Sequence, residues 1–379
     1  GEPVEMTMVD EYTVKFVLPR PSNDYLSGLA IMYLIPKHIY ENVEDMDTCE
    51  ENMLGIGYGP YQLVEYSPGE KLVVERYEDY YKGPGNYKTI EYRVMQDTTA
   101  QEVALLNGEI DYFPVTDAQT LEKYKNDSNY NIHSFTEGRI NYMQLNQNSP
   151  LFHDSDKARE AVCKALNIEE IVAGAYGSEE LARPATGTVI CAGEVYYNED
   201  VPNYQQDLET AKQLVAETGL DQQPMRLIYN RDRNNMEETA LIIQQQLRDV
   251  GIEVQITAME SSAFFESFFY ADKGDWDIGL NGWSSSGRAS YPSWYIKGSS
   301  YCLNTYTTDE LNALWTAADT TTENPEEAYN EVSRLLQTYY TYVPISSTNK
   351  VIVTPANTHG WEDSPLGDLS DYSVLYQTK

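Results

Sequence analysis

The sequence predicts an α/β protein built from two lobes. Three observations lead to this prediction: strand patterns dominate the front of the chain, strands and helices alternate in its middle, and strand patterns return near its end. With 379 residues, the chain is long enough for two or three domains. We therefore expect a large split lobe from residues 1–135 plus 346–379 and a second α/β lobe from residues 136–345.

In residues 1–135 the sequence predicts hairpins and one clear helix. Apolar residues recur at every second position over residues 4–18, and further strands are predicted over 72–77 and 90–95. A helix is predicted over 98–106, directly behind the capping residue Asp97. The front lobe is therefore expected to be rich in strands.

The middle of the chain shows the pattern of crossover helices between parallel strands. Because a chain inserted into a split lobe passes between the lobes twice, we expect two crossover strands, near His133–Asn141 and Val343–Asn349. The crossover pattern consists of predicted strands over 225–229, 252–258 and 276–283 and predicted helices over 208–219, 236–250 and 262–270.

Charge excludes some classes of partner. The sequence holds 60 Asp and Glu against 26 Lys and Arg, a net charge of −34. Such a surface repels the phosphates of nucleic acids and of anionic membranes. No apolar run reaches the length of a membrane span, so direct insertion of this segment into a bilayer is not expected.

Motifs for metals, cofactors and catalysis are not found. The four cysteines form no CxxC pair, their disulfide pairing stays open, and the four histidines lack metal-ligand spacing. GxSxG, HExxH and SxxK do not occur. Asp275 and Asp277 are a carboxylate pair close to tryptophans, but such pairs are always available in so acidic a chain and carry little weight. A secreted carbohydrate-active enzyme that uses aromatic platforms is the alternative from another class. We expect no cofactor and no enzyme activity.

Aromatic residues indicate a binding surface. The chain has 32 tyrosines and five tryptophans, and the densest group is "GWSSSGRASYPSWY", which begins at Gly282 after a predicted strand. Open α/β sheets bind ligands at strand ends, so this segment is a candidate pocket wall, and an exposed loop with stacked aromatics is the alternative. Its candidate ligand contacts are Trp283, Ser284, Ser286, Arg288 and Tyr291.

The segment "GIGYGPYQLVEY", from Gly55, resembles a phosphate-binding loop only superficially. It lacks the Lys–Ser/Thr pair of a Walker loop, and a strand pattern rather than a helix follows it. A glycine-bent entry to a hairpin is the interpretation that fits.

Several segments, in order along nearly the whole chain, resemble the peptide/nickel-type, family 5 solute-binding proteins of ABC importers. The segments are "GIGYGPYQLVEYSPGEKLVVERYEDYYKG", "ALLNGEIDYFPV", "MQLNQNSPLFHDSDKAREAVCKALNIEEIV", "QQQLRDVGIEVQI", "DWDIGLNGW" and "YTTDELNALW". The resemblance implies a two-lobed periplasmic-binding-protein type II architecture with mixed sheets and two crossover strands. It implies that an N-terminal portion, with a signal segment and a small extra domain, is missing from this chain.

The resemblance also implies a function. The protein is expected to be the extracytoplasmic substrate-binding component of an ABC importer, periplasmic or a cell-surface lipoprotein. It is expected to capture a peptide or peptide-sized solute in a cleft between two lobes that close by hinge motion, with the membrane permease of the importer as its partner. Tyr58 and Tyr61, in the glycine block that begins at Gly55, are expected near that cleft. Asn141 and Tyr142, at the end of the first crossover segment, complete the predicted ligand-binding set.

The chain departs from the family pattern after Trp283. Peptide-binding members have an aspartate soon after this tryptophan that holds the ligand's α-amino group, whereas residues 284–288 contain no acid. This difference argues against recognition of a free peptide N-terminus and favours a ligand with an anionic or hydroxylated end. Sugars, oligosaccharides and metal chelates remain alternatives. Because a cleft that lacks one wall leaves a ligand partly in water, we expect this fragment to bind ligand more weakly than a full-length parent. A lobe without its first strands also exposes a sheet edge through which the fragment is expected to pair with another chain.

Overall fold

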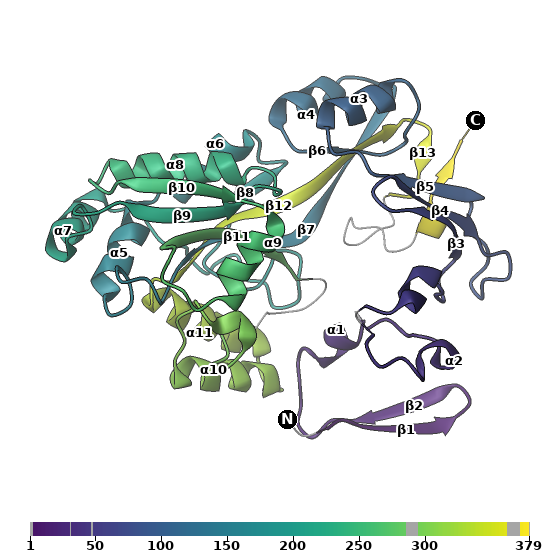
Figure 1. Cartoon of the computed structure of the whole chain (residues 1–379), viewed down its shortest axis with the longest axis horizontal. Coiled ribbons are helices and arrows are strands. Elements are labelled where there is room, and N and C mark those ends of the chain that lie inside the picture. Colours follow the sequence, from purple (N-terminus) through teal and green to yellow (C-terminus); the bar gives the residue numbers. More distant parts are fainter. Residues whose placement is uncertain (1–2, 31, 47, 286–294, 362–371, 379) are drawn as a thin grey trace. The chain divides into compact units, whose positions relative to one another are not determined.

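The chain divides into two compact units in the computed structural model (Figure 1). Unit 1 comprises Gly1–Ala30 and Glu137–Asn349, and unit 2 comprises Ile31–Thr136 and Lys350–Lys379. The structure describes residues 3–30, 32–46, 48–285, 295–361 and 372–378.

Two long strands carry the chain from one unit to the other. The unit borders at 136/137 and 349/350 lie inside β7 (Tyr130–Leu145) and β12 (Tyr342–Pro355), the strands that contain the two predicted crossover segments. Residues 1–30 group with unit 1, whereas the sequence placed them in the other lobe. Hydrogen bonds to distant residues of unit 1 account for this difference. The Asn23 side chain donates to the carbonyl oxygens of Ala318 and Thr321.

Unit 1 is built around a mixed sheet. Its strand order is β10-β9-β11-β7-β12, and β8 pairs with β12. The neighbouring pairs β10·β9 and β11·β9 are parallel, as the predicted crossover helices require, whereas β11 runs antiparallel to β7. The strands not yet bounded are β8 (Ala182–Pro184), β9 (Met225–Asn230), β10 (Val254–Met259) and β11 (Ile278–Ser284).

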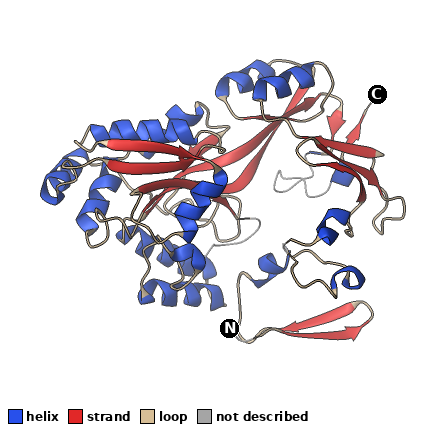
Figure 2. Ribbon diagram, in the orientation of Figure 1, coloured by secondary structure: helices blue, strands red, loops and turns tan. Residues whose placement is uncertain are grey.

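Helices cover both faces of this sheet (Figure 2). Side-chain caps begin several of them; the Ser155 hydroxyl, for example, accepts a hydrogen bond from the Ala158 amide at the start of α5. The predicted helix over 262–270 is α9 followed by one π-helical turn, Glu266–Tyr270. The helices are α5 (Asp156–Ala165), α6 (Ile168–Tyr176), α7 (Leu208–Thr218), α8 (Met236–Arg248), α9 (Ser261–Phe265), α10 (Asp309–Thr320) and α11 (Pro325–Thr338).

The N-terminal segment adds a hairpin and a short helix to unit 1. Strands β1 (Glu5–Asp10) and β2 (Thr13–Val17) pair antiparallel, as the alternating pattern of residues 4–18 predicts, and α1 (Tyr25–Ala30) follows.

Unit 2 contains smaller sheets and short helices. A three-stranded antiparallel sheet has the order β3-β4-β5, β6 pairs antiparallel with the end of β12, and β13 pairs with β14. The helix predicted over 98–106 is confirmed as α3, with the Asp97 carboxylate accepting from the Ala100 amide. The bounds are β3 (Tyr61–Ser67), β4 (Lys71–Arg76), β5 (Thr89–Arg93), β6 (Phe113–Val115), β13 (Thr358–His359), β14 (Tyr376–Gln377), α2 (Lys37–Tyr40), α3 (Thr98–Leu106) and α4 (Ala118–Lys125).

Gly55 shows what the glycine block does in unit 2. It follows the 3₁₀ helix Glu50–Leu54 and has φ +58°, a left-handed conformation that is unfavourable for residues with a side chain. A Cβ atom at Gly55 would also lie 2.5 Å from Cδ2 of Leu63 in β3. The glycine ends a helical turn and lets the chain pack closely on the following strand.

No helix within the described part of the chain combines the length and the apolar character that crossing a bilayer requires.

Candidate functional site

The residues predicted to bind ligand lie in separate places. Ser286, Arg288 and Tyr291 fall outside the described residues. Trp283, Ser284, Asn141 and Tyr142 belong to the central strands of unit 1, and Tyr58 and Tyr61 belong to unit 2.

Trp283 and Tyr142 point into an aromatic core. Trp283 is 6% exposed and Tyr142 1%. The indole N–H of Trp283 donates to the hydroxyl oxygen of Tyr342 at 3.4 Å, and the rings of Tyr142 and Tyr342 lie 4.7 Å apart. Side chains of α10 and α11 complete this cluster. The sequence predicted a pocket wall at Trp283; the register of β11 on β7 places its ring on the face of the sheet that packs against these helices.

Asn141 and Ser284 lie on the opposite face of the same two strands. Arg139 pairs across the strands with Ser284, and Asn141 pairs with Gly282, whereas the intervening Trp283 faces the aromatic core. Alternation along a strand therefore separates the predicted set into a buried aromatic part and a polar part.

The polar part is organised around Arg139, which is not among the predicted ligand-binding residues. Its Nε donates to Oδ1 of Asn141 at 3.0 Å, and its Nη1 donates to Oγ of Ser284 at 3.4 Å. The Asn141 amide in turn donates to the hydroxyls of Tyr176 at 2.9 Å and Ser346 at 3.2 Å. Four elements, β7, β11, β12 and α6, thus contribute to one hydrogen-bonded group.

Gly282 makes room for this group. A Cβ atom at this position would collide with Oδ1 of Asn141 and Nη2 of Arg139. The guanidinium and the amide therefore lie directly over the backbone of β11, a close approach that only glycine permits here.

The electrostatics of the group are set by burial and by a second arginine. Burial lowers the pKa of Arg139, the carboxylate of Glu137 raises it, and the neighbouring Arg233 lowers it again. Burial likewise raises the pKa of Tyr176. At neutral pH the group therefore combines a positive charge with neutral hydroxyl and amide groups, which suits a ligand that carries negative charge.

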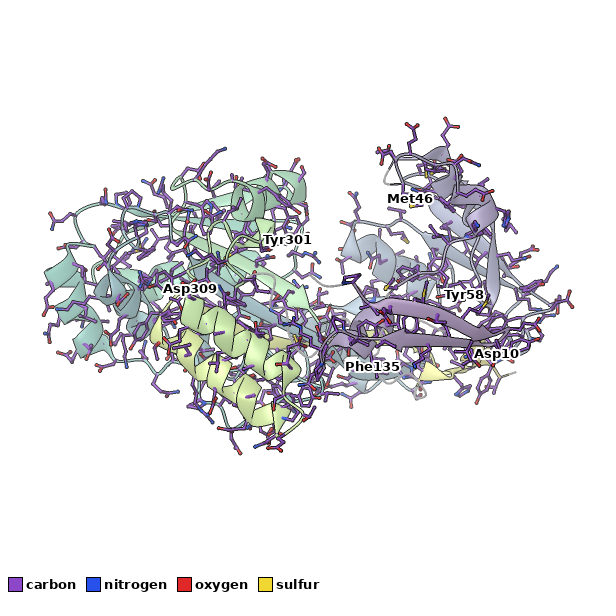
Figure 3. All side chains as sticks on the ribbon, turned by 90° about the horizontal axis from the view of Figure 1, so that it is seen from below. Asp10, Met46, Tyr58, Phe135, Tyr301 and Asp309 are labelled. Carbon is purple, nitrogen blue, oxygen red and sulfur yellow. The ribbon has the colours of Figure 1, made fainter. Side chains whose placement is uncertain are left out.

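Tyr58 and Tyr61 differ in exposure. The side chain of Tyr58 is exposed and is labelled in Figure 3. The Tyr61 hydroxyl donates to the carbonyl oxygen of Tyr87 at 3.2 Å, and its ring lies over Gly85, where a Cβ would collide with it. Tyr61 thus holds the turn that leads into β5. The assignment of the nine residues to a ligand site stays a prediction.

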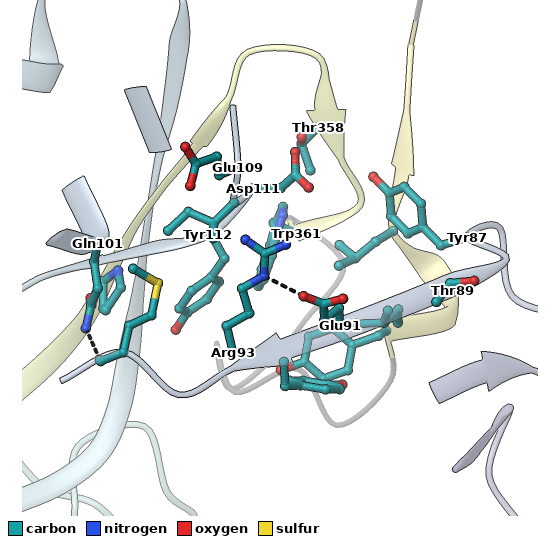
Figure 4. A pocket seen from close by; sticks show the side chains of 17 residues that line it. Tyr87, Thr89, Glu91, Arg93, Gln101, Glu109, Asp111, Tyr112, Thr358 and Trp361 are labelled. Atoms are coloured by element: carbon teal, nitrogen blue, oxygen red, sulfur yellow. Dashed lines mark hydrogen bonds and ion pairs between the residues drawn. The ribbon is translucent and has the colours of Figure 1, made fainter. Parts of the chain in front are cut away.

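Unit 2 contains a second candidate, a pocket of about 600 Å³ that no predicted site residue lines. Figure 4 shows the aromatic rings of Tyr87, Tyr112 and Trp361 around it, together with charged side chains of β5. Arg93 in its wall forms an ion pair with Glu91 at 2.5 Å, so its positive charge is already matched. Burial raises the pKa of Tyr87 and of Tyr92 to about 12.

The lining of this pocket combines aromatic and charged side chains. Glu109 and Asp111 add negative charge to its lining. Within the described residues, the hydroxyl of Thr358 and the indole N–H of Trp361 are buried without a hydrogen-bond partner. Both atoms are shielded from solvent, so the polar surface of the pocket comes from its charged side chains.

Asp277, one member of the carboxylate pair, has a structural role. It is buried, accepts hydrogen bonds from the Arg226 backbone at 2.7 Å and from its guanidinium at 2.8 Å, and accepts from Ser149 at 2.5 Å. These bonds connect β9 to the start of β11. Across the described residues, no three or more His, Cys, Asp or Glu side chains gather in a way that could hold a metal ion.

Comparison with known proteins identifies the family. Residues 1–304 match the sequence profile of the bacterial extracellular solute-binding proteins, family 5 Middle. The chain belongs to this family. Its members are extracytoplasmic binding proteins that capture substrates for ABC importers, and the resemblance stated from the sequence is therefore confirmed.

Individual relatives agree with the family assignment. The oligopeptide-binding protein AppA of Bacillus subtilis is 28% identical over 405 residues, which cover 97% of this chain and 71% of AppA. The substrate-binding protein CtaP of Listeria monocytogenes is 31% identical, with a TM-score of 0.87 over 100% of this chain and 78% of CtaP.

A third comparison concerns the fold. The structure of B. subtilis AppA in complex with a nonapeptide has a TM-score of 0.83 at 24% identity, over 99% of this chain and 78% of AppA. The type II periplasmic-binding-protein architecture expected from the sequence is confirmed by these structures.

Proposed function

We propose that this family 5 protein captures a peptide, or a solute of peptide size, and presents it to the membrane permease of an ABC importer. The observation that carries the proposal is the match to AppA, a protein named for oligopeptide binding, along 97% of this chain. The structure of AppA with a nonapeptide supports the same ligand class. Within unit 1, the polar group around Arg139 offers a surface for a charged part of such a ligand.

A thermal-shift screen tests the ligand class. The purified chain is heated with a pool of synthetic peptides, with a pool of oligosaccharides, and with a nickel–histidine chelate. Because a ligand that binds only the folded state stabilises it by about 2.7 kcal/mol at a hundredfold excess over Kd, a rise in Tm is expected with the peptide pool. A rise with the sugars or the chelate alone would assign the protein to another ligand class. Turnover of a glycan would overturn the expectation that the protein is not an enzyme.

Attachment to the cell surface through a lipid is the second part of the proposal. The family is extracytoplasmic, and a lipid anchor keeps a binding protein close to its permease. Labelling of the producing cells with a radioactive fatty acid checks this: the intact protein should carry the label and sediment with membranes. An unlabelled, freely diffusing protein would contradict the anchor without affecting ligand capture.

A further inference from the structure

Arg139 differs from two other arginines of unit 1 that are buried or partly buried. Arg159 is 2% exposed and forms an ion pair with Asp156, and the guanidinium of Arg226 pairs with Asp277. Arg139 is half-buried, yet its hydrogen bonds go to an amide and a hydroxyl, and no carboxylate among the described residues lies within ion-pair distance. A positive charge withdrawn from water normally has an anionic partner, because its desolvation is otherwise uncompensated.

The nearest carboxylates are held by other groups. Glu137 attracts Arg139 electrostatically, but its Oε2 accepts a hydrogen bond from Thr348. Glu194 accepts from the hydroxyl of Ser285, next to the strand end that carries Ser284. In a chain with a net charge of −34, the lack of an ion pair for Arg139 among the described residues requires an explanation.

A second cation lies close enough to act on Arg139. Arg233, in the turn between β9 and α8, is exposed and lowers the pKa of Arg139 through repulsion. Two arginines that repel each other destabilise the ligand-free protein slightly, and an anion bound to both relieves that repulsion. The room left by Gly282 and the hydrogen bonds that Arg139 donates to Asn141 and Ser284 hold its guanidinium in one orientation. A preoriented guanidinium can bind a carboxylate with two parallel hydrogen bonds.

We propose that Arg139, assisted by Arg233, is a specificity residue that binds a carboxylate of the captured solute. For a peptide ligand, the group recognised is a terminal or side-chain carboxylate. The inference rests on the proposed function for the identity of the ligand, whereas the anion-binding property belongs to the described residues themselves.

The test compares a peptide acid with its amide. The peptide most enriched from a synthetic pool is identified by mass spectrometry and prepared with a free and with an amidated carboxyl end, without acidic side chains. Calorimetry should show at least about tenfold tighter binding of the acid to the unaltered protein, the range for a hydrogen bond to a charged group. In Arg139→Gln the acid and the amide should bind equally, and in Arg139→Lys the ratio should be intermediate.

Two further variants control the comparison. Arg248→Gln removes the same charge from the end of α8, where its ion pair with Glu253 is long, at 3.9 Å, and should keep the full acid-to-amide ratio. Arg233→Gln, at an exposed position, should reduce the ratio and keeps the test decisive if Arg139→Gln does not fold. An unchanged ratio in Arg139→Gln, or in Arg233→Gln where only that variant folds, overturns the inference.

A peptide-free measurement separates this inference from the proposed function. Acetate is titrated into ¹⁵N-labelled protein while the side-chain Nε–H signals of the arginines are followed by NMR, and the Arg139 signal is assigned by its loss in Arg139→Gln. A saturable shift of that signal with acetate, but not with sodium chloride, supports the anion site even if no peptide binds. If acetate leaves the signal unchanged and no peptide distinguishes acid from amide, the inference fails, whether or not peptides bind.

Discussion

Neighbouring residues of β7 and β11 have opposite roles. Ile140 and Trp283 face the aromatic core, whereas Arg139 and Ser284 face the polar group on the other side of the sheet. Trp283 is packed into unit 1, since 6% of its surface remains exposed and its N–H is paired with Tyr342. Replacing Trp283 is therefore expected to lower the free energy of unfolding.

Replacing Trp283 by Ala should destabilise unit 1 by about 3–5 kcal/mol, the usual cost of removing a large buried aromatic side chain. Urea unfolding followed by circular dichroism measures this loss. Trp283→Phe, which keeps most of the buried surface, is the matched control and should lose clearly less. Unchanged unfolding of Trp283→Ala, together with lost ligand affinity, would instead make Trp283 a ligand contact.

At the scale of elements, short-range signals explain where segments begin and end. Side-chain caps begin α3 and α5, and a left-handed glycine, Gly55, ends the 3₁₀ helix that precedes β3. Gly55 also packs against Leu63, whereas Gly59, four residues later, has open space around it and no positive φ. The two glycines therefore have different structural requirements within one block.

Gly55→Ala should destabilise unit 2 by about 1–3 kcal/mol, because the added Cβ strains a left-handed backbone and collides with Leu63. Gly59→Ala is the matched control and should change stability by less than about 1 kcal/mol. Thermal unfolding of both variants measures the difference. Equal effects of the two substitutions would show that the block tolerates side chains throughout and that Gly55 has no special role.

For the whole molecule, buried phenols and thiols determine how stability depends on alkaline pH. Burial raises the pKa of Tyr87 to about 12 and of Cys302 to about 11. It raises those of Tyr142 and Tyr295 well above the ordinary value of 10.0. In the unfolded chain, these groups ionise at their ordinary values, about 8.5 for cysteine and about 10 for tyrosine.

Stability should therefore be complete below about pH 8.5 and fall as the pH rises from there to about 12. The sign follows because, in this range, the folded state binds more protons than the unfolded state, so raising the pH favours unfolding. Urea midpoints at a series of pH values measure the decline, which should persist in high salt, since burial causes it. A decline that salt abolishes would instead assign it to repulsion among the surface carboxylates behind the net charge of −34.

The sequence by itself determined the local elements and the family. The cap at Asp97, the helical period of α8 and the alternating strands depend on residues a few positions apart, and these are the interactions that a linear pattern records. Tertiary structure alone decided which side chains meet: Arg139 reaches Ser284 across 145 residues, and strand pairing directs Trp283 into the core. Register sets the face on which each side chain lies, and it depends on a partner strand far along the chain, so the aromatic segment could be found from the sequence but its orientation could not.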